Sequence, residues 1–186
     1  MVSLASLWLP IVLSAATVFL ASFVTHMVLT YHHSDFRKLP AEDDVMEALR
    51  RFNLPQGDYM VPHPQNPAAM KSKEFQDKLN RGPVFIATIF RNGQQGMGAQ
   101  LGKWFVFCLV VSLFAGYMAS RSLEIGAPYL RVSQIASTTA FLGYVMAQWG
   151  DVIWYRRAVS TVLKATADGL LYGLLTGGMF GWLWPR

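Results

Sequence analysis

The chain has very little cysteine and little charge, and both shortages narrow the class of protein. Cys108 is the only cysteine among 186 residues, so the sequence excludes an intrachain disulfide and a cysteine-based metal site. Charged residues make up 15% of the chain, against roughly 25% in soluble domains. Hydrophobic residues make up 53% and are gathered into long blocks. This distribution is typical of an integral membrane protein.

A basic surface of the kind that binds nucleic acid is also missing. The net charge is +5, but the segment 32–100 is nearly balanced, with nine Lys and Arg against eight Asp and Glu. The surplus positive charge lies at the ends of the apolar blocks, without interleaved aromatic residues. We therefore expect the chain to contact membrane lipids and not nucleic acid.

Four apolar blocks predict transmembrane helices at residues 4–31, 103–120, 129–154 and 162–184. At about 1.5 Å per residue, each block can cross a hydrocarbon core of roughly 30 Å. The first block lacks the basic start of a cleavable signal peptide, so we expect it to be retained. The third block is diluted by Ser, Thr and Gln. The predicted class is an all-α membrane protein with four spans.

The distribution of Lys and Arg predicts the orientation of these spans. Four spans place both termini on one side of the membrane. Thirteen of the sixteen Lys and Arg residues fall in the segments on the opposite side. Because positive loops stay in the cytoplasm, we expect the segment 32–100 to be cytoplasmic and both termini to be outside.

The polar segment 32–100 predicts a small α/β insertion between the first and second spans. "PAEDDVMEALRRF" and "SKEFQDKLNRGP" predict short helices, the second one with Ser72 as its N-cap and Gly82–Pro83 as its stop. "VFIATIF" predicts a strand, with residues 59–61 as its expected partner. A unit this small has little core of its own. We expect it to lean on the membrane surface or on another protein.

The glycines of "NGQQGMGAQLGKW" do not have the spacing of a phosphate-binding loop. Met97 stands where the first glycine is required, and Trp104 stands where Ser or Thr would hold magnesium. The segment predicts a flexible linker into the second span.

Small residues recur at every fourth position of the last block, in the manner of a glycine zipper. In lipid, helices associate through close packing and hydrogen bonds, which small side chains permit. The predicted packing positions are Ala165, Gly169, Gly173, Gly177 and Gly181, with Ser112 and Gly116 on the second span. Packing within one bundle, contact with another copy or partner subunit, and a pore lining all remain open.

A few polar residues are expected at membrane depth, where such groups are costly and often functional. They are His26, Gln148, Asp151, Lys164 and Asp168. Lys164 lies one turn before Asp168 on the same helix face, which predicts an ion pair between them. A contact with a partner and a route for protons or ions are the alternatives.

The histidines do not predict a metal or haem site. His26 is the only histidine inside a predicted span, and the neighbours His32 and His33 point to different sides of a helix. No spacing supplies the three or four converging ligands that zinc usually requires. No nucleophile with a base and no pair of carboxylates is visible either. We therefore predict no metal site, no cofactor and no catalytic residue.

Three stretches carry a resemblance that covers nearly the whole length: "YHHSDFRKLPAEDDVMEALR" where the first span ends, "GDYMVPHP" in the insertion and "GLLTGGMFGWLWPR" at the C-terminal end. In these the chain resembles a set of small four-span bacterial inner-membrane proteins of uncharacterised function. The resemblance implies a multi-pass protein of the bacterial inner membrane, with periplasmic termini under the orientation above. It implies no activity. We predict a non-enzymatic accessory or scaffolding subunit of a larger membrane assembly, which packs against other membrane helices through its small-residue faces. The alternative is a small homo-oligomeric transporter or channel that uses His26, Asp168 and Lys164.

Overall fold

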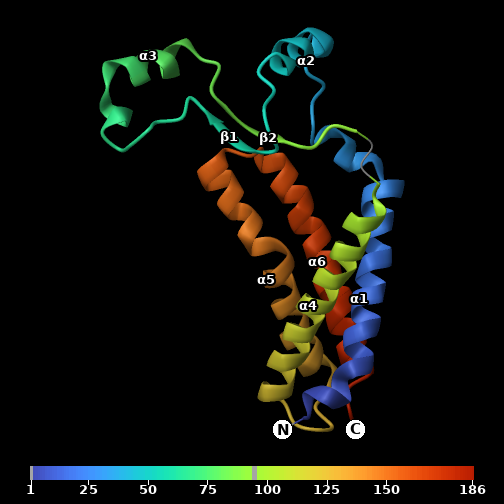
Figure 1. Cartoon of the computed structure of the whole chain (residues 1–186). Coiled ribbons are helices and arrows are strands. Elements are labelled where there is room, and N and C mark those ends of the chain that lie inside the picture. The colour runs from blue at the N-terminus through green and yellow to red at the C-terminus, as the bar shows by residue number, and fades with distance from the viewer. Residues whose placement is uncertain (1, 94–95) are drawn as a thin grey trace. The chain divides into compact units, whose positions relative to one another are not determined.

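The computed structural model describes residues 2–93 and 96–186, which fall into two compact units. The first unit contains the long helices, and the second lies between Lys38 and Gln95. The described residues are mostly helical, with one two-stranded sheet. Figure 1 shows the long helices running side by side.

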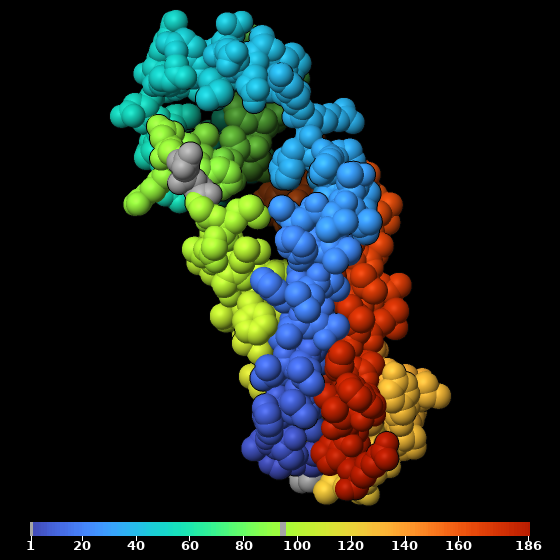
Figure 2. All heavy atoms as spheres, turned by 90° about the vertical axis from the view of Figure 1, so that its right-hand side faces the viewer, coloured from blue at the N-terminus to red at the C-terminus, as the bar shows by residue number. Residues whose placement is uncertain are grey.

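Four long helices form the first unit. They are α1 (Trp8–Phe23), α4 (Gly98–Ser122), α5 (Tyr129–Tyr155) and α6 (Val159–Trp182). Each packs against two neighbours, in the cyclic order α1, α4, α5, α6. The view turned by 90° shows α1 beside α6 (Figure 2). This arrangement is a four-helix bundle whose N- and C-terminal ends lie together (Figure 1).

Two helical stretches are long and apolar enough to cross a membrane, namely Leu4–Val28 and Gly98–Ser122. The first joins a 3₁₀ turn, α1 and a π-helical turn (Val24–Val28) into one rod. α5 and α6 are equally long but less hydrophobic, because they carry Gly, Ser and Thr along their length. By hydropathy, therefore, the structure supports two spans among its described residues.

The core of the bundle consists of two apolar clusters. One cluster includes Leu7, Ile11, Val132 and Phe180 and lies at the end of the bundle that holds the chain termini (Figure 1). The other brings Val18, Cys108, Val145 and Tyr172 together farther along the same helices. These side chains interlock segments that are distant in sequence, which sets the relative positions of α1 and α6.

The second unit contains α2 (Glu42–Arg50), β1 (Gly57–Val61), α3 (Lys73–Arg81) and β2 (Phe85–Ile89). The strands pair antiparallel with Tyr59 opposite Ala87, which confirms the predicted partner of "VFIATIF". Oγ of Ser72 accepts a hydrogen bond of 3.2 Å from the backbone N–H of Phe75, as expected of an N-cap. Gly82 ends α3 with a φ of 59°, in the region that favours glycine.

The second unit has no buried core. No residue from Lys38 to Gly93 is buried. Its large apolar side chains are exposed instead, among them Phe52 at 71%, Phe90 at 66% and Val84 at 55%. A unit of this size buries too little surface to be stabilised by its own core.

The ends of the predicted first and second spans differ from the observed helix ends. The chain leaves the first helical rod at Leu29, whose ψ of 134° is extended, and not at residue 31. α4 begins at Gly98, so the second half of the predicted linker is helical. Gln94 and Gln95 of that linker lie outside the described residues.

Candidate functional site

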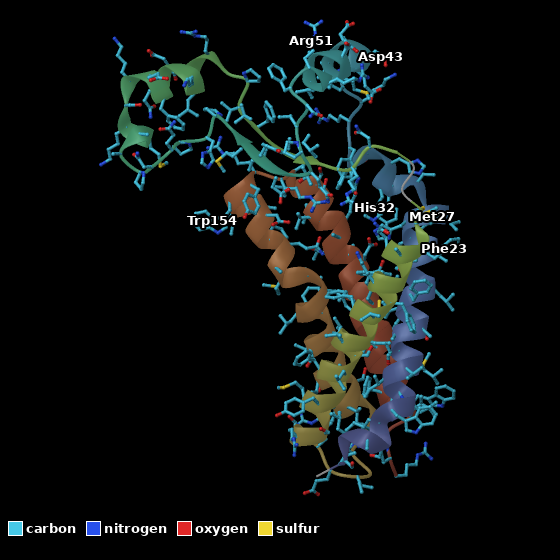
Figure 3. The ribbon with its side chains drawn as sticks, viewed as in Figure 1. Phe23, Met27, His32, Asp43, Arg51 and Trp154 are labelled. Atoms are coloured by element: carbon cyan, nitrogen blue, oxygen red, sulfur yellow. The ribbon has the colours of Figure 1, made fainter. Side chains whose placement is uncertain are left out.

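A polar cluster lies where the chain leaves the first helical rod. The π-helical turn ends at Val28, Leu29 is extended, and a 3₁₀ turn follows at Thr30–Ser34. This change of path folds the 3₁₀ turn back against α6. In Figure 3, His32 lies on the side of α1 that faces α6, whereas Phe23 and Met27 point away from the bundle. π-Helical turns inside helices are frequent at functional sites.

His32 bridges two carboxylates. Its Nδ1 lies 2.6 Å from Oδ2 of Asp35, and its Nε2 lies 2.7 Å from Oδ2 of Asp168. Burial disfavours the charged imidazolium, but the hydrogen bonds to Asp35 and Asp168 outweigh it and raise the pKa of His32 above its ordinary value. Because both partners are carboxylates, the protonated His32 donates from both nitrogens and links the 3₁₀ turn to α6.

Asp168 is the buried acceptor of this cluster, with 5% of its surface exposed. The Tyr31 hydroxyl donates to Oδ1 of Asp168, while His32 occupies Oδ2. Both carboxylate oxygens are thus hydrogen-bonded, as a buried charge requires.

Lys164, which lies one turn before Asp168 in α6, also belongs to the cluster. Its Nζ donates to the backbone oxygen of Tyr31 at 2.6 Å, to Oγ of Ser34 at 2.7 Å and to Oδ1 of Asp35 at 2.8 Å. Burial disfavours the Asp35 carboxylate, but the hydrogen bonds from Lys164 and His32 outweigh it and hold the pKa of Asp35 below its ordinary value.

The predicted pair of Lys164 with Asp168 is replaced by two other pairs. Lys164 pairs with Asp35, and Asp168 pairs with His32. The physical reason is the 3₁₀ turn, which places a second carboxylate and a backbone carbonyl within reach of the long Lys164 side chain.

His26 stacks on His32, with ring centroids 4.3 Å apart and an angle of 8° between the ring planes. Its Nδ1 lies 2.9 Å from Oγ1 of Thr25 and 3.1 Å from the carbonyl oxygen of Ser22. One potential ligand atom from each of His26, His32 and Asp168 lies within 4.8 Å of the others. These groups converge although the sequence spacing predicts no such set, because the first helical rod ends before Leu29 and does not continue to residue 31.

The other two predicted polar residues do not join the cluster. Nε2 of Gln148 donates to the backbone oxygen of Tyr144 within α5, at 2.8 Å. Asp151 lies 3.7 Å from Nη1 of Arg157, and both side chains are more than 40% exposed. Both contacts are local: the first lies within α5, and the second joins α5 to the residues that connect it to α6.

The glycine face of α6 packs against α5 of the same chain. A Cβ atom added at Gly177 would lie 1.9 Å from Oγ of Ser137 and 2.6 Å from the backbone oxygen of Ser133. At Gly169 it would lie 2.1 Å from Cγ2 of Val145. Gly173 and Gly181 are similarly close to α5, at 3.0 and 2.7 Å from their nearest neighbours. A partner helix therefore has no room on this face.

The remaining predicted packing positions are Ser112 and Gly116 on α4 and Ala165 on α6. Ser112 is fully buried, and Ala165 is half-buried. A Cβ atom at Gly116 would lie 3.1 Å from the ring of Phe180. Gly116 thus admits an aromatic side chain of α6 and not a backbone.

No protein-family model, curated protein or solved structure matches the chain.

Proposed function

We propose that the protein is a four-span accessory subunit of the bacterial inner membrane, whose segment 38–93 binds another protein. The observation that carries the proposal is the segment's lack of any buried residue, together with its exposed Phe52, Val84 and Phe90. Exposed apolar side chains of this size are typical of surfaces that bind a partner. The bundle anchors that surface at the membrane.

The lengths and outer surfaces of α5 and α6 support two further spans. Their 27 and 24 residues correspond to about 40 and 36 Å of helix. Their low hydropathy arises largely from residues that face each other, such as Gly177 and Ser137. Their large exposed side chains include Leu142, Met146, Ile153, Leu170, Leu171, Leu174 and Trp182. Trp154 projects from the end of α5 (Figure 3), where an interfacial aromatic residue is expected.

The charge distribution supports a cytoplasmic position for the segment 38–93 and a periplasmic one for both termini. Thirteen of the sixteen Lys and Arg residues fall on the side of this segment under the four-span topology. Lys and Arg near the ends of spans favour the cytoplasm.

A protein partner is favoured over the lipid surface because the segment lacks a positive excess. Its charges are nearly balanced, with α2 beginning in Glu42, Asp43 and Asp44 and ending in Arg50. Binding to an anionic membrane depends on clusters of Lys and Arg. A protein surface with complementary charge can satisfy both signs at once.

The glycine face supports a self-contained bundle. α5 fills it along its length, so the partner contact falls to other surfaces of the molecule. The sequence predicts the glycine face as the contact surface for other membrane helices. We propose the insertion as the docking surface instead.

The test is cross-linking in cells, followed by purification of the full chain in mild detergent and mass spectrometry. Phe52→Asp combined with Phe90→Asp changes two exposed side chains of the segment. Gln65→Asp and Asn80→Asp form the matched control, because they add the same charges at exposed polar positions of the same segment. We expect a stoichiometric partner with the wild type and the control, and its loss with the double Phe variant. A partner retained by every variant, or a pure homo-oligomer, contradicts the proposal.

A small homo-oligomeric transporter is the second candidate, and the cluster of His26, His32 and Asp168 supports it. Ionisable groups at the end of a span are suited to moving protons or ions. The test is flux through liposomes that contain purified protein, with Asp168→Asn as the variant. Flux that disappears in a folded variant supports transport, and liposomes that stay tight with the wild type contradict it.

A further inference from the structure

We propose that His26, His32 and Asp168 form a binding site for a divalent transition-metal ion of the zinc type. The inference goes beyond the accessory role and does not depend on it. The three ligands come from three segments: the π-helical turn, the following 3₁₀ turn and α6. Their ligand atoms already lie within 4.8 Å of one another.

The donor set and its spacing suit zinc. Two imidazoles and one carboxylate are among the three-ligand sets that zinc accepts, with a fourth position left for water or another ligand. Metal–ligand bonds of about 2.0–2.1 Å in tetrahedral geometry require ligand atoms about 3.3 Å apart. Nε2 of His32 and Oδ2 of Asp168 are 2.7 Å apart. The rings of His26 and His32 are stacked within 8° of parallel, so binding requires the exposed His26 ring to turn until the ion lies in the plane of both rings.

Each ligand is oriented by a second partner, as metal ligands usually are. Nδ1 of His32 donates to Asp35, which leaves Nε2 to face the ion. Nδ1 of His26 faces the carbonyl oxygen of Ser22, which leaves its Nε2 free to bind. Oδ1 of Asp168 accepts from Tyr31, which leaves Oδ2 for the metal. This set of partners distinguishes the cluster from a chance meeting of three side chains.

Charge also favours a cation. Asp168 and Asp35 face Lys164 and the protonated His32, so loss of a proton from His32 leaves one negative charge for the ion to balance. When Nε2 of His32 is protonated, its proton lies between the imidazole and Asp168. The ion takes the place of this proton, which is released to solvent, as is usual when histidine binds a metal. His26 is the exposed member of the set, so the ion has access from outside the bundle.

The test uses the full chain in detergent, stripped with a chelator and then titrated with Zn²⁺ or Co²⁺ alone. Calorimetry gives the stoichiometry, and the visible absorption of Co²⁺ reports its coordination. We expect one equivalent per chain. His26→Gln and Asp168→Asn should each weaken binding at least roughly tenfold. His33→Gln is the matched control, because it removes the neighbouring histidine and should leave binding unchanged.

Folding is followed in every variant by gel filtration and thermal melting. His26 is exposed and contributes no ion pair, so His26→Gln tests the site even where Asp168→Asn unfolds. The proposal is overturned when the wild type binds no stoichiometric metal. It is also overturned when folded His26→Gln binds as tightly as the wild type, or when His33→Gln loses binding to the same extent.

Discussion

Nε2 of His32 lies 2.7 Å from Oδ2 of Asp168, although the two residues are 136 positions apart in the chain. This contact holds the 3₁₀ turn after the first helical rod against α6. Lys164 makes a second link between the same segments, through Asp35 and the backbone of Tyr31. The connection between α1 and α6 is thus polar at this end of the bundle and apolar at the other, where Ile11 and Phe180 belong to one cluster.

Lys164→Met is expected to destabilise the bundle. It removes three hydrogen bonds and one of the two cations that face Asp35, whose side chain is 10% exposed. We expect a loss of about 1–3 kcal/mol, measured by thermal unfolding in detergent. Lys103→Met, at an exposed position of α4, is the matched control and should change stability little. Equal effects of the two substitutions would show that the Lys164 contacts contribute nothing specific.

The pairing of Lys164 with Asp35 can be isolated in a double-mutant cycle. Asp35→Asn alone and Lys164→Met alone should each lower the melting temperature. Because the two side chains share one ion pair, the double variant should lose less than the sum of the single losses. Strict additivity in the unfolding free energies would place the two residues in separate interactions.

Gly177→Ala is expected to weaken the packing of α6 on α5. The new methyl group would lie within 2.6 Å of the Ser133 backbone oxygen, so the helices must separate or shift. We expect a loss of about 1–3 kcal/mol, again measured by unfolding in detergent. Gly102→Ala, in α4, meets no atom within 4 Å and should be neutral or stabilise by up to about 1 kcal/mol. A tolerated Gly177→Ala would contradict the close approach.

Ser72→Ala is expected to fray the start of α3. The substitution removes the oxygen that accepts from the backbone N–H of Phe75, which costs about 1 kcal/mol. Hydrogen exchange should therefore become faster at the first amides of α3. Ser72→Asp keeps a capping oxygen and should preserve the slower exchange. Unchanged exchange in the alanine variant would mean that the cap is not formed in solution.

The sequence predicts the secondary structure better than it predicts the polar cluster. Long apolar blocks locate the long helices, and the β-branched and aromatic residues of "VFIATIF" locate β2, which pairs with β1 as predicted. These signals are local. The cluster depends instead on where the first helical rod ends, and a shift of that end to Leu29 turns His32 toward α6.

Three cluster residues, His26, Lys164 and Asp168, stand out in the sequence as polar groups within apolar blocks. Tyr31, His32 and Asp35 do not, because the first resembles an interfacial aromatic residue and the others follow the span. The spacing of His32 and Asp35, three positions apart, is the one local signal of their contact. Pairing with α6 is long-range, so periodicity alone cannot reveal it.

The four-span topology is tested most directly by single cysteines in a Cys108→Ala background, labelled in intact cells with a membrane-impermeant thiol reagent. Ser3→Cys and Glu124→Cys represent the N-terminal end and the connection between α4 and α5. Gln65→Cys and Ala158→Cys represent the segment 38–93 and the connection between α5 and α6. The account predicts labelling of the first pair in intact cells and of the second pair only after lysis. Glu124→Cys and Ala158→Cys reacting from the same side would contradict it.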